Sequence, residues 1–182
     1  MANPISSSGV QNGYTVFAEQ ILEISHALNG TGSNSIYIVG DVKQGSLTNK
    51  TDNTSSFAHG YQATASGLYS HAEGESTYAS GAYSHAEGFD TYAYQNYSHA
   101  EGSFTEAHGI GSHAEGRLTQ ATANYSHAEG LGTWAGGDYQ HVQGRYNLLS
   151  PFQSAFIIGN GTNDGSRSNL VYASGSFFSV TG

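Results

Sequence analysis

A histidine and a glutamate stand two residues apart in the motif Ser-His-Ala-Glu-Gly, which recurs from Ser70, Ser84, Ser98, Ser112 and Ser126. An imidazole and a carboxylate at this spacing could act as a catalytic pair, bind a metal ion or form a structural ladder. His-x-Glu also belongs to the zinc deaminase signature, but that chemistry requires a Pro-Cys-x-x-Cys partner. The chain has no cysteine, so we exclude deaminase chemistry.

The composition is unlike that of an ordinary globular domain. Only 10% of the 182 residues are charged, 25 are glycine, and the formal net charge is −9. The few basic residues are scattered, at Lys43, Lys50, Arg117, Arg145 and Arg167. Without a basic patch or a long apolar run, the chain is expected to bind no nucleic acid and to insert into no membrane. Aliphatic material is scarce, so surface must be buried by stacking or by association between copies.

Glycines at an unbroken spacing of 14 residues reveal a repeat. They are Gly60, Gly74, Gly88, Gly102, Gly116, Gly130 and Gly144. The full form of the repeat is Ser-His-Ala-Glu-Gly-x-x-Thr-x-Ala-x-Gly-x-Tyr. The first copy reads SFAHG at 56–60 and the last QHVQG at 140–144, and such atypical ends are expected where a stack must be capped.

Two short alternating runs in each copy, Ser-x-Ala-x-Gly and Thr-x-Ala-x-Gly, predict two β-strands rather than a helix. Each glycine would cost a helix about 1 kcal/mol relative to alanine. We therefore predict an all-β fold in which each 14-residue repeat is one coil of a narrow β-solenoid. Alternation places small residues inside: Ser70, Ala72, Gly74, Thr77, Ala79 and Gly81 in one coil.

The residues between them must point outward and form columns, because adjacent coils stack at about 4.8 Å. On the second strand the outward residues vary, as at Tyr78, Glu106 and Gln120. Stacked carboxylates would repel one another unless histidines of the same or another chain lay between them. We therefore predict that the regular columns form an interface near a symmetry axis. The predicted interface residues are His71, Glu73, His85, Glu87, His99, Glu101, His113, Glu115, His127, Glu129 and His141.

The coil that begins YSHAEG, at 69–74, resembles the left-handed parallel β-roll of YadA-like trimeric adhesin heads, over about residues 56–145. The resemblance implies a homotrimer. It also places His71 and Glu73 where that family carries Val and Ile facing the three-fold axis, so the implied interface is polar. SHAEG coils are similar to those of bacteriophage tail-fibre and appendage proteins, and the stretch 155–169 resembles a segment that follows such coils there.

Three parts are predicted: an N-terminal attachment segment at 1–54, a β-roll of seven repeats at 55–146 and a C-terminal β-region at 147–182. Apolar residues at alternating spacings of three and four predict a helix over about 14–29, either in a short coiled coil or against a neighbour. Its seam is Tyr14, Phe17, Ile21, Ile24 and Leu28. A strand is predicted over about 35–39 and a polar linker after it. Further strands are predicted at 155–158 and 169–172.

Chemistry other than architecture has weaker support. Histidines meeting on a three-fold axis could bind a metal ion or an anion there: His71, His85, His99, His113, His127 and His141. We favour a hydrogen-bonded ladder, because identical repetition is typical of architecture. Exposed aromatic residues could stack on sugars of a host surface: Tyr78, Tyr92, Tyr94 and Trp134. No hydrolase-like arrangement stands out, so we expect no enzyme and no cofactor.

The sequence favours a structural trimeric fibre or spike protein of a phage tail or related virion appendage. It would be anchored through its N-terminus to other tail or baseplate proteins, and it could contribute to adhesion. Two alternatives remain. One is a head fragment of a bacterial trimeric autotransporter adhesin at the cell surface, which the lack of an export signal disfavours. The other is an ice-binding protein, which the inward-facing threonine row disfavours.

Overall fold

The computed structural model describes residues 42–45, 50–51 and 56–181. The chain divides into two units, Met1–Ile38 and Val39–Gly182, and all described residues belong to the second. The helix expected over about 14–29 and the strand over about 35–39 lie outside the described residues. Within them every regular element is a strand, and no helix there could cross a membrane.

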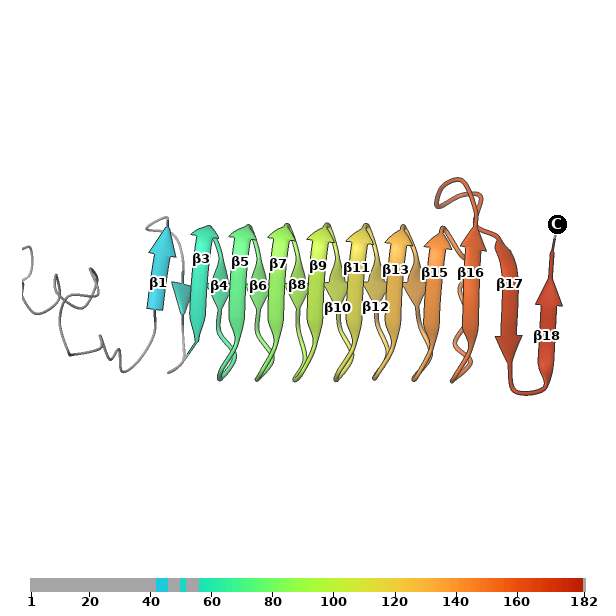
Figure 1. Ribbon diagram of the computed structural model, residues 1–182, viewed down its shortest axis with the longest axis horizontal. Coiled ribbons are helices and arrows are strands. Elements are labelled where there is room, and N and C mark those ends of the chain that lie inside the picture. Colours follow the sequence, from blue (N-terminus) through green and yellow to red (C-terminus); the bar gives the residue numbers. More distant parts are fainter. Residues whose placement is uncertain (1–41, 46–49, 52–55, 182) are drawn as a thin grey trace, which may run out of the picture. The chain divides into compact units, whose positions relative to one another are not determined.

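One sheet contains a long strand from each coil, and these strands lie side by side in Figure 1. They are β3 (Phe57–Tyr61), β5 (His71–Glu75), β7 (His85–Phe89), β9 (His99–Ser103), β11 (His113–Arg117), β13 (His127–Leu131) and β15 (His141–Arg145). Neighbours pair in parallel and in register, so that His113 pairs with both His99 and His127. Each repeat is thus one coil, as the 14-residue period predicts.

A second sheet contains two-residue strands, one from each coil, which appear behind the long strands in Figure 1. They are β2 (Lys50–Thr51), β4 (Thr64–Ala65), β6 (Tyr78–Ala79), β8 (Tyr92–Ala93), β10 (Glu106–Ala107), β12 (Gln120–Ala121) and β14 (Trp134–Ala135). The prediction of two strands per coil is confirmed. The strands begin one residue later than the Ser-x-Ala-x-Gly pattern indicates, because Ser70 belongs to the turn, where its hydroxyl donates to the Gly67 carbonyl at 2.7 Å.

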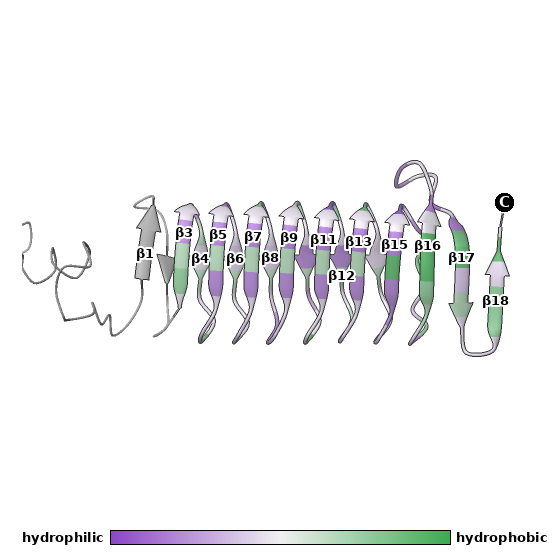
Figure 2. Ribbon diagram, viewed as in Figure 1, coloured by the Kyte–Doolittle hydropathy of each residue, from purple (hydrophilic) through white to green (hydrophobic). Residues whose placement is uncertain are grey.

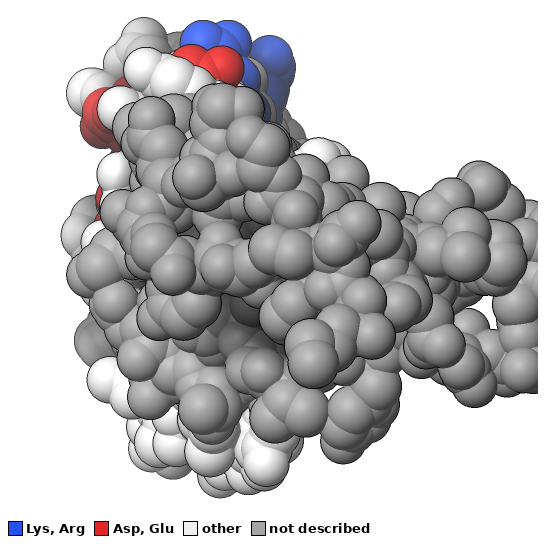
Figure 3. Space-filling model, turned by 90° about the vertical axis from the view of Figure 1, so that its left-hand side faces the viewer, with Lys and Arg blue, Asp and Glu red and all other residues white. Residues whose placement is uncertain are grey.

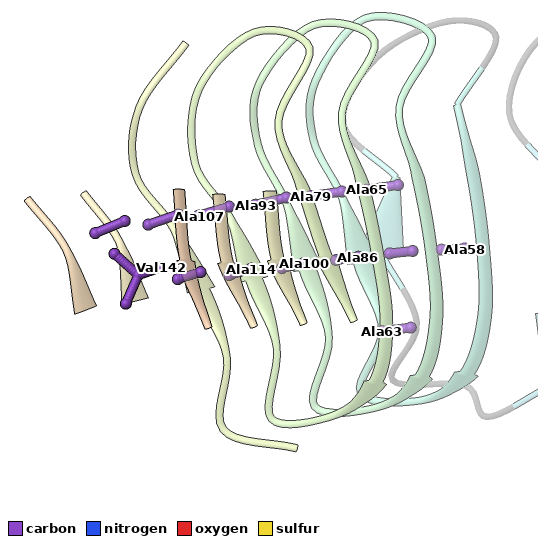
Figure 4. Packing of buried hydrophobic residues seen from close by; sticks show 14 of the residues in the cluster. Ala58, Ala63, Ala65, Ala79, Ala86, Ala93, Ala100, Ala107, Ala114 and Val142 are labelled. Carbon is purple, nitrogen blue, oxygen red and sulfur yellow. The ribbon is translucent and has the colours of Figure 1, made fainter. Parts of the chain in front are cut away.

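Alanine fills the space between the two sheets. Figure 4 shows two lines of alanines, one from the short strands through Ala65 to Ala107 and one from the long strands through Ala58 to Ala114. These side chains have no exposed surface. Ser70 and Thr77, which belong to the coil of Ala72 and Ala79, are also buried. Because two walls this close leave room only for small groups, the predicted inward rows of serine, alanine and threonine are confirmed. The prediction is wrong for Gly74 and its equivalents, which are partly or fully exposed because they lie at the outer end of each long strand.

The glycines that define the repeat stack directly on one another. Gly102 has a φ of 106°, and a Cβ placed on it would lie 2.1 Å from the carbonyl oxygen of Gly116. Both the left-handed φ and the missing space exclude other residues. Glycine therefore sets how closely successive coils approach.

The C-terminal end of the solenoid is closed by amide side chains. Asn147 stands where the earlier coils have threonine, and its amide bonds to the backbone N–H and C=O of Trp134 at 2.8 and 3.0 Å. Gln140 stands where they have serine, and it accepts from the Gly136 N–H at 2.8 Å and donates to the Ser150 carbonyl at 3.0 Å. These amides replace the bonds that a further short strand would make, which is the capping expected of an atypical last repeat.

Additional strands extend the long-strand sheet at both ends. β1 (Val42–Gly45) pairs in parallel with β3, and β16 (Phe156–Asn160) pairs in parallel with β15. β17 (Asn169–Ser174) and β18 (Phe177–Val180) then follow as an antiparallel hairpin. Figure 2 shows aligned bands of hydropathy across β5 to β13 and more hydrophobic strands from β15 onward. The stack therefore begins before the first repeat and continues beyond the last.

Candidate functional site: the histidine and glutamate face

The histidines of the long strands form one continuous stack on the outer face of their sheet. From His71 to His127 neighbouring rings lie nearly parallel, with centroids 4.6 to 4.8 Å apart and interplanar angles of 5° to 7°. The ring of Phe57 covers the first histidine edge-on at 5.0 Å, and that of Phe156 contacts the last, His141, at 5.4 Å. Parallel register at a fixed period forces this stacking, since each ring lies directly above its equivalent.

The glutamates form a second stack beside the histidines. Four histidines, His99, His113, His127 and His141, face the glutamate of the preceding coil, whereas His71 lies 3.6 Å from Glu73 of its own coil. The Nε2 atom of His113 lies 3.3 Å from a carboxylate oxygen of Glu101, and that of His127 lies 3.5 Å from one of Glu115. His141 and Glu129 are 4.0 Å apart. The predicted interface residues thus share one face, where histidines and glutamates of the same chain already meet.

Neighbouring glutamates of this column shift one another's pKa values in opposite directions. The hydrogen bond with Glu115, together with burial, raises the pKa of Glu101 to about 7. Hydrogen bonds with Glu101 and Glu129 lower the pKa of Glu115. A protonated carboxyl that donates to an ionised neighbour explains the opposite directions, because two carboxylates so close cannot both ionise freely. Proton sharing therefore relieves the repulsion that the sequence predicts for this column.

Four histidines of this face have lowered pKa values. Burial, and after it the proximity of a second imidazole, lowers the pKa of His85 and lowers that of His113 to about 4. The same causes lower the pKa of His71 and His141. The Nε2 atoms of five histidines are buried without a hydrogen-bond partner among the described residues: His71, His85, His99, His113 and His127. Imidazole nitrogens without a hydrogen-bond partner therefore line this face.

Two groups of side chains on this face have the composition of a metal site. They are His85, Glu87 and His99, and His113, Glu115 and His127. In each group one donor atom per residue lies within 4.8 Å of the others. Imidazole and carboxylate groups both bind divalent transition metals. The two groups of side chains therefore differ from the axial site predicted from the sequence, which consists of histidines alone.

The predicted glycan-contact residues separate into two places on the short-strand sheet. Tyr92 and Tyr94 stack at 5.6 Å, Tyr78 lies 6.4 Å from each of them, and Tyr94 stacks on His108 at 4.5 Å. Trp134 lies further along, where its indole N–H donates to Thr122 at 2.9 Å. Trp134 also lines a pocket of about 410 Å³, whose other lining residues are Leu118, Gln120, Gly132, Thr133, Tyr146, Asp164 and Arg167.

A tyrosine stack at the turn before each long strand was not singled out from the sequence. Tyr83 and Tyr97 stack at 5.3 Å, and Tyr125 and Tyr139 at 5.4 Å. These tyrosines have positive φ and are more than half exposed, and Gly111 interrupts the stack. The signal was the tyrosine that ends most copies of the repeat.

The acidic residues of the solenoid are concentrated on the face that carries the glutamate column. In Figure 3, turned by 90° from Figure 1, acidic atoms of the described residues are visible along the upper left side and at the top, where they lie beside the basic atoms. The glutamate column accounts for five of the chain's 14 acidic residues, namely Glu73, Glu87, Glu101, Glu115 and Glu129. The regular face is therefore the main acidic feature of the solenoid.

Comparison with known proteins finds no relative. No protein-family model, no curated protein and no solved structure matches the chain. The fold established here is a parallel β-solenoid of 14-residue coils, compatible with a β-roll repeat.

Proposed function

We propose that the chain is the rod-forming part of a homotrimeric fibre or spike on a phage tail or related virion appendage. In this proposal three left-handed β-rolls associate through their histidine and glutamate faces. The N-terminal segment attaches the trimer to other tail or baseplate proteins. The work of such a protein is mechanical, since it extends or stiffens the structure that carries it.

The observation that carries this proposal is the uncovered regular face. Histidine and glutamate repeat there without variation from β5 to β13, and no described element covers them. Packing inside the coil cannot explain the repetition, because these side chains point away from the alanine rows. An identical surface repeated along a rod fits contact with copies of the same chain, since symmetry then satisfies every coil in the same way.

The thin interior supports association. The buried apolar residues are almost all alanines, with Val142 and Ile157 only at the C-terminal end. An alanine side chain removes little apolar surface from water, so a single solenoid gains little from burial. Association of three chains would bury the half-exposed histidine and glutamate side chains as well.

The oligomeric state and its dependence on the regular face test this proposal. We expect the full chain to sediment as a trimer, and the double variant His99→Ala/Glu101→Ala to lower the melting temperature of that trimer. The matched control is His108→Ala/Glu106→Ala, which removes a histidine and glutamate pair on the other sheet, 2.6 Å apart. The measurements should be made with a chelator present.

A monomer at all concentrations, or equal losses in both double variants, would contradict the placement of the interface. The proposed location is tested separately. Antibodies against the chain should label the tail or an appendage of intact particles in electron micrographs, and labelling of bacterial surfaces instead would favour the adhesin alternative.

The pocket beside Trp134 supports an adhesive role as a second candidate. Its walls combine the aromatic rings of Trp134 and Tyr146 with the polar groups of Gln120, Asp164 and Arg167. Aromatic faces with nearby hydrogen-bonding groups suit a sugar ring. We expect the chain to bind some members of a panel of immobilised oligosaccharides and Trp134→Ala to lose this binding while remaining trimeric. Equal binding by the variant would exclude this pocket.

A further inference from the structure

Each of the two histidine and glutamate triads offers three ligand atoms from a single chain. In the first, His85 and His99 come from adjacent coils and Glu87 lies beside them, and the second repeats this arrangement two coils later. All donor atoms within a triad lie within 4.8 Å of one another. The fixed register of the sheet holds them there, because neighbouring imidazoles are stacked 4.8 Å apart.

The imidazole nitrogens of these triads have no hydrogen-bond partner, whereas the carboxylates of Glu87 and Glu115 hydrogen-bond to neighbouring glutamates. The Nε2 atom of His113 also lies 3.3 Å from Glu101. The Nε2 atoms of His85 and His99 are buried and make no hydrogen bond within the described part of the chain. The nearest carboxylate oxygen, that of Glu87, lies 3.7 Å from the Nε2 atom of His99, too far for a hydrogen bond. In the second triad the corresponding distance, from Glu115 to His127, is 3.5 Å. Buried polar atoms are normally satisfied, so atoms left unpaired on a repeating scale require an explanation.

We propose that each chain binds two divalent transition-metal ions, one between His85, Glu87 and His99 and one between His113, Glu115 and His127. Two imidazoles and one carboxylate form a ligand set that binds Zn²⁺ and leaves a fourth position open for water or another group. Imidazole nitrogen suits Zn²⁺, Ni²⁺ and Cu²⁺ better than Mg²⁺ or Ca²⁺, which prefer oxygen.

The geometry needs only a small adjustment to accept an ion. Ligand atoms about 2.1 Å from a tetrahedral Zn²⁺ lie about 3.4 Å from one another. The donor atoms must therefore approach by roughly 1 Å, which rotation of the imidazole rings about their side-chain bonds can supply. The side chains are only half-buried, so this rotation does not disturb the alanine interior.

The inference does not rest on the proposed trimer, because all three ligands of each site come from one chain. It differs from an ion on a three-fold axis, which would be shared by three chains. The number of ions bound per chain distinguishes the two arrangements. If the chains do associate through this face, the open position of each ion is directed toward the interface.

The experiment measures Zn²⁺ bound by the full chain, prepared without a histidine affinity tag, by equilibrium dialysis and elemental analysis. We expect about two ions per chain, about one for His99→Ala, and none for His99→Ala/His127→Ala. His108→Ala is the matched control, since His108 pairs with Glu106 and stacks on Tyr94 on the other sheet, and it should keep both ions. Circular dichroism checks folding, and His99→Gln replaces His99→Ala if the latter does not fold.

Several results would overturn the proposal. One ion for every three chains would place the metal on a shared axis. Loss of Zn²⁺ in His108→Ala, or retention in His99→Ala/His127→Ala, would place it elsewhere. Absence of Zn²⁺ binding at micromolar concentration would exclude the sites. A monomeric chain that binds two ions would uphold this inference while contradicting the proposed trimer, so the two can fail separately.

Discussion

The two sheets of the solenoid face the same interior but differ on their outer surfaces. Both contribute an unbroken row of buried alanines to the space between them. On the long-strand sheet the outward residues are histidine and glutamate in coil after coil. On the short-strand sheet the outward position of β6 to β14 is occupied in turn by Tyr, Tyr, Glu, Gln and Trp.

This difference separates two causes of repetition. Steric exclusion explains the inner rows of both sheets, since only small side chains fit between the walls. It cannot explain the outer rows, because the short-strand sheet tolerates many residue types at the same depth. The constancy of histidine and glutamate must therefore come from contacts along the column, with another chain or with a ligand.

The largest loss of stability is expected at a position where the next coil lies too close for any side chain, so that only glycine fits. Gly102 is one of the stacked glycines on the long-strand sheet. It has a φ of 106°, and a carbonyl oxygen of the next coil lies 2.1 Å from where a Cβ would stand. We expect Gly102→Ala to lower the free energy of unfolding by about 3 kcal/mol or more, measured by denaturant unfolding.

The matched control is Gly136→Ala on the short-strand sheet, whose outward residues vary from coil to coil. A Cβ there would approach nothing closer than 3.4 Å, and earlier coils carry Tyr94 and His108 at the same place. We expect a change within about 0.5 kcal/mol. Similar costs at the two positions would show that both faces are equally constrained and would remove the contrast between them.

A smaller effect should appear in the pH dependence of stability without metal. The pKa of Glu101 is raised to about 7, so its protonated form is favoured in the folded state. This contribution is complete below the ordinary glutamate pKa and is lost as pH rises through about 7. A glutamine in place of Glu101 stays uncharged at every pH. We therefore expect Glu101→Gln to remove the loss of stability near pH 7 when melting temperatures are measured between about pH 5 and about pH 8. A parallel profile in wild type and variant would contradict the shared proton.

The pH dependence that His113 contributes has the opposite sign to that of Glu101. Tyr92, on the short-strand sheet, contributes none near neutral pH. The pKa of His113 is lowered to about 4, so its contribution is present above the ordinary histidine pKa and is lost as pH falls toward 4. A hydrogen bond to Asp90, and then burial, raises the pKa of Tyr92 to about 12. Its contribution is lost only as pH rises through 12, so Tyr92→Phe should leave the profile near neutrality unchanged.

Much of the fold could be predicted because each coil repeats the same local argument. The period of 14 gave the coil, alternation gave the inward rows, and the degenerate last copy indicated a cap that Gln140 and Asn147 now explain. β1, β2 and β18 were not predicted. Their sequences lack the repeat, and they become strands only because a neighbouring strand edge is available for pairing.

The candidate site was only partly predictable. The sequence placed histidine and glutamate in neighbouring columns. Whether a histidine faces the glutamate of the preceding coil, as His113 and His127 do, or that of its own coil, as His71 does, depends on side-chain rotation. The raised pKa of Glu101 beside the lowered pKa of Glu115 is also invisible in a repeat whose copies are identical. Tyrosine at positive φ was missed because left-handed turns normally favour glycine or asparagine.

The sequence alone determined the period, the two strands of each coil and the identity of the buried rows, because these follow from local alternation and side-chain size. Only the tertiary structure decided which polar atoms are buried without partners, because this depends on how the side chains of neighbouring coils turn toward one another. Stacking of the coils removes the histidine Nε2 atoms from water and brings Glu101 and Glu115 close enough to shift each other's pKa in opposite directions. Both effects come from distances between residues 14 apart or nearly so, which no single copy of the repeat contains.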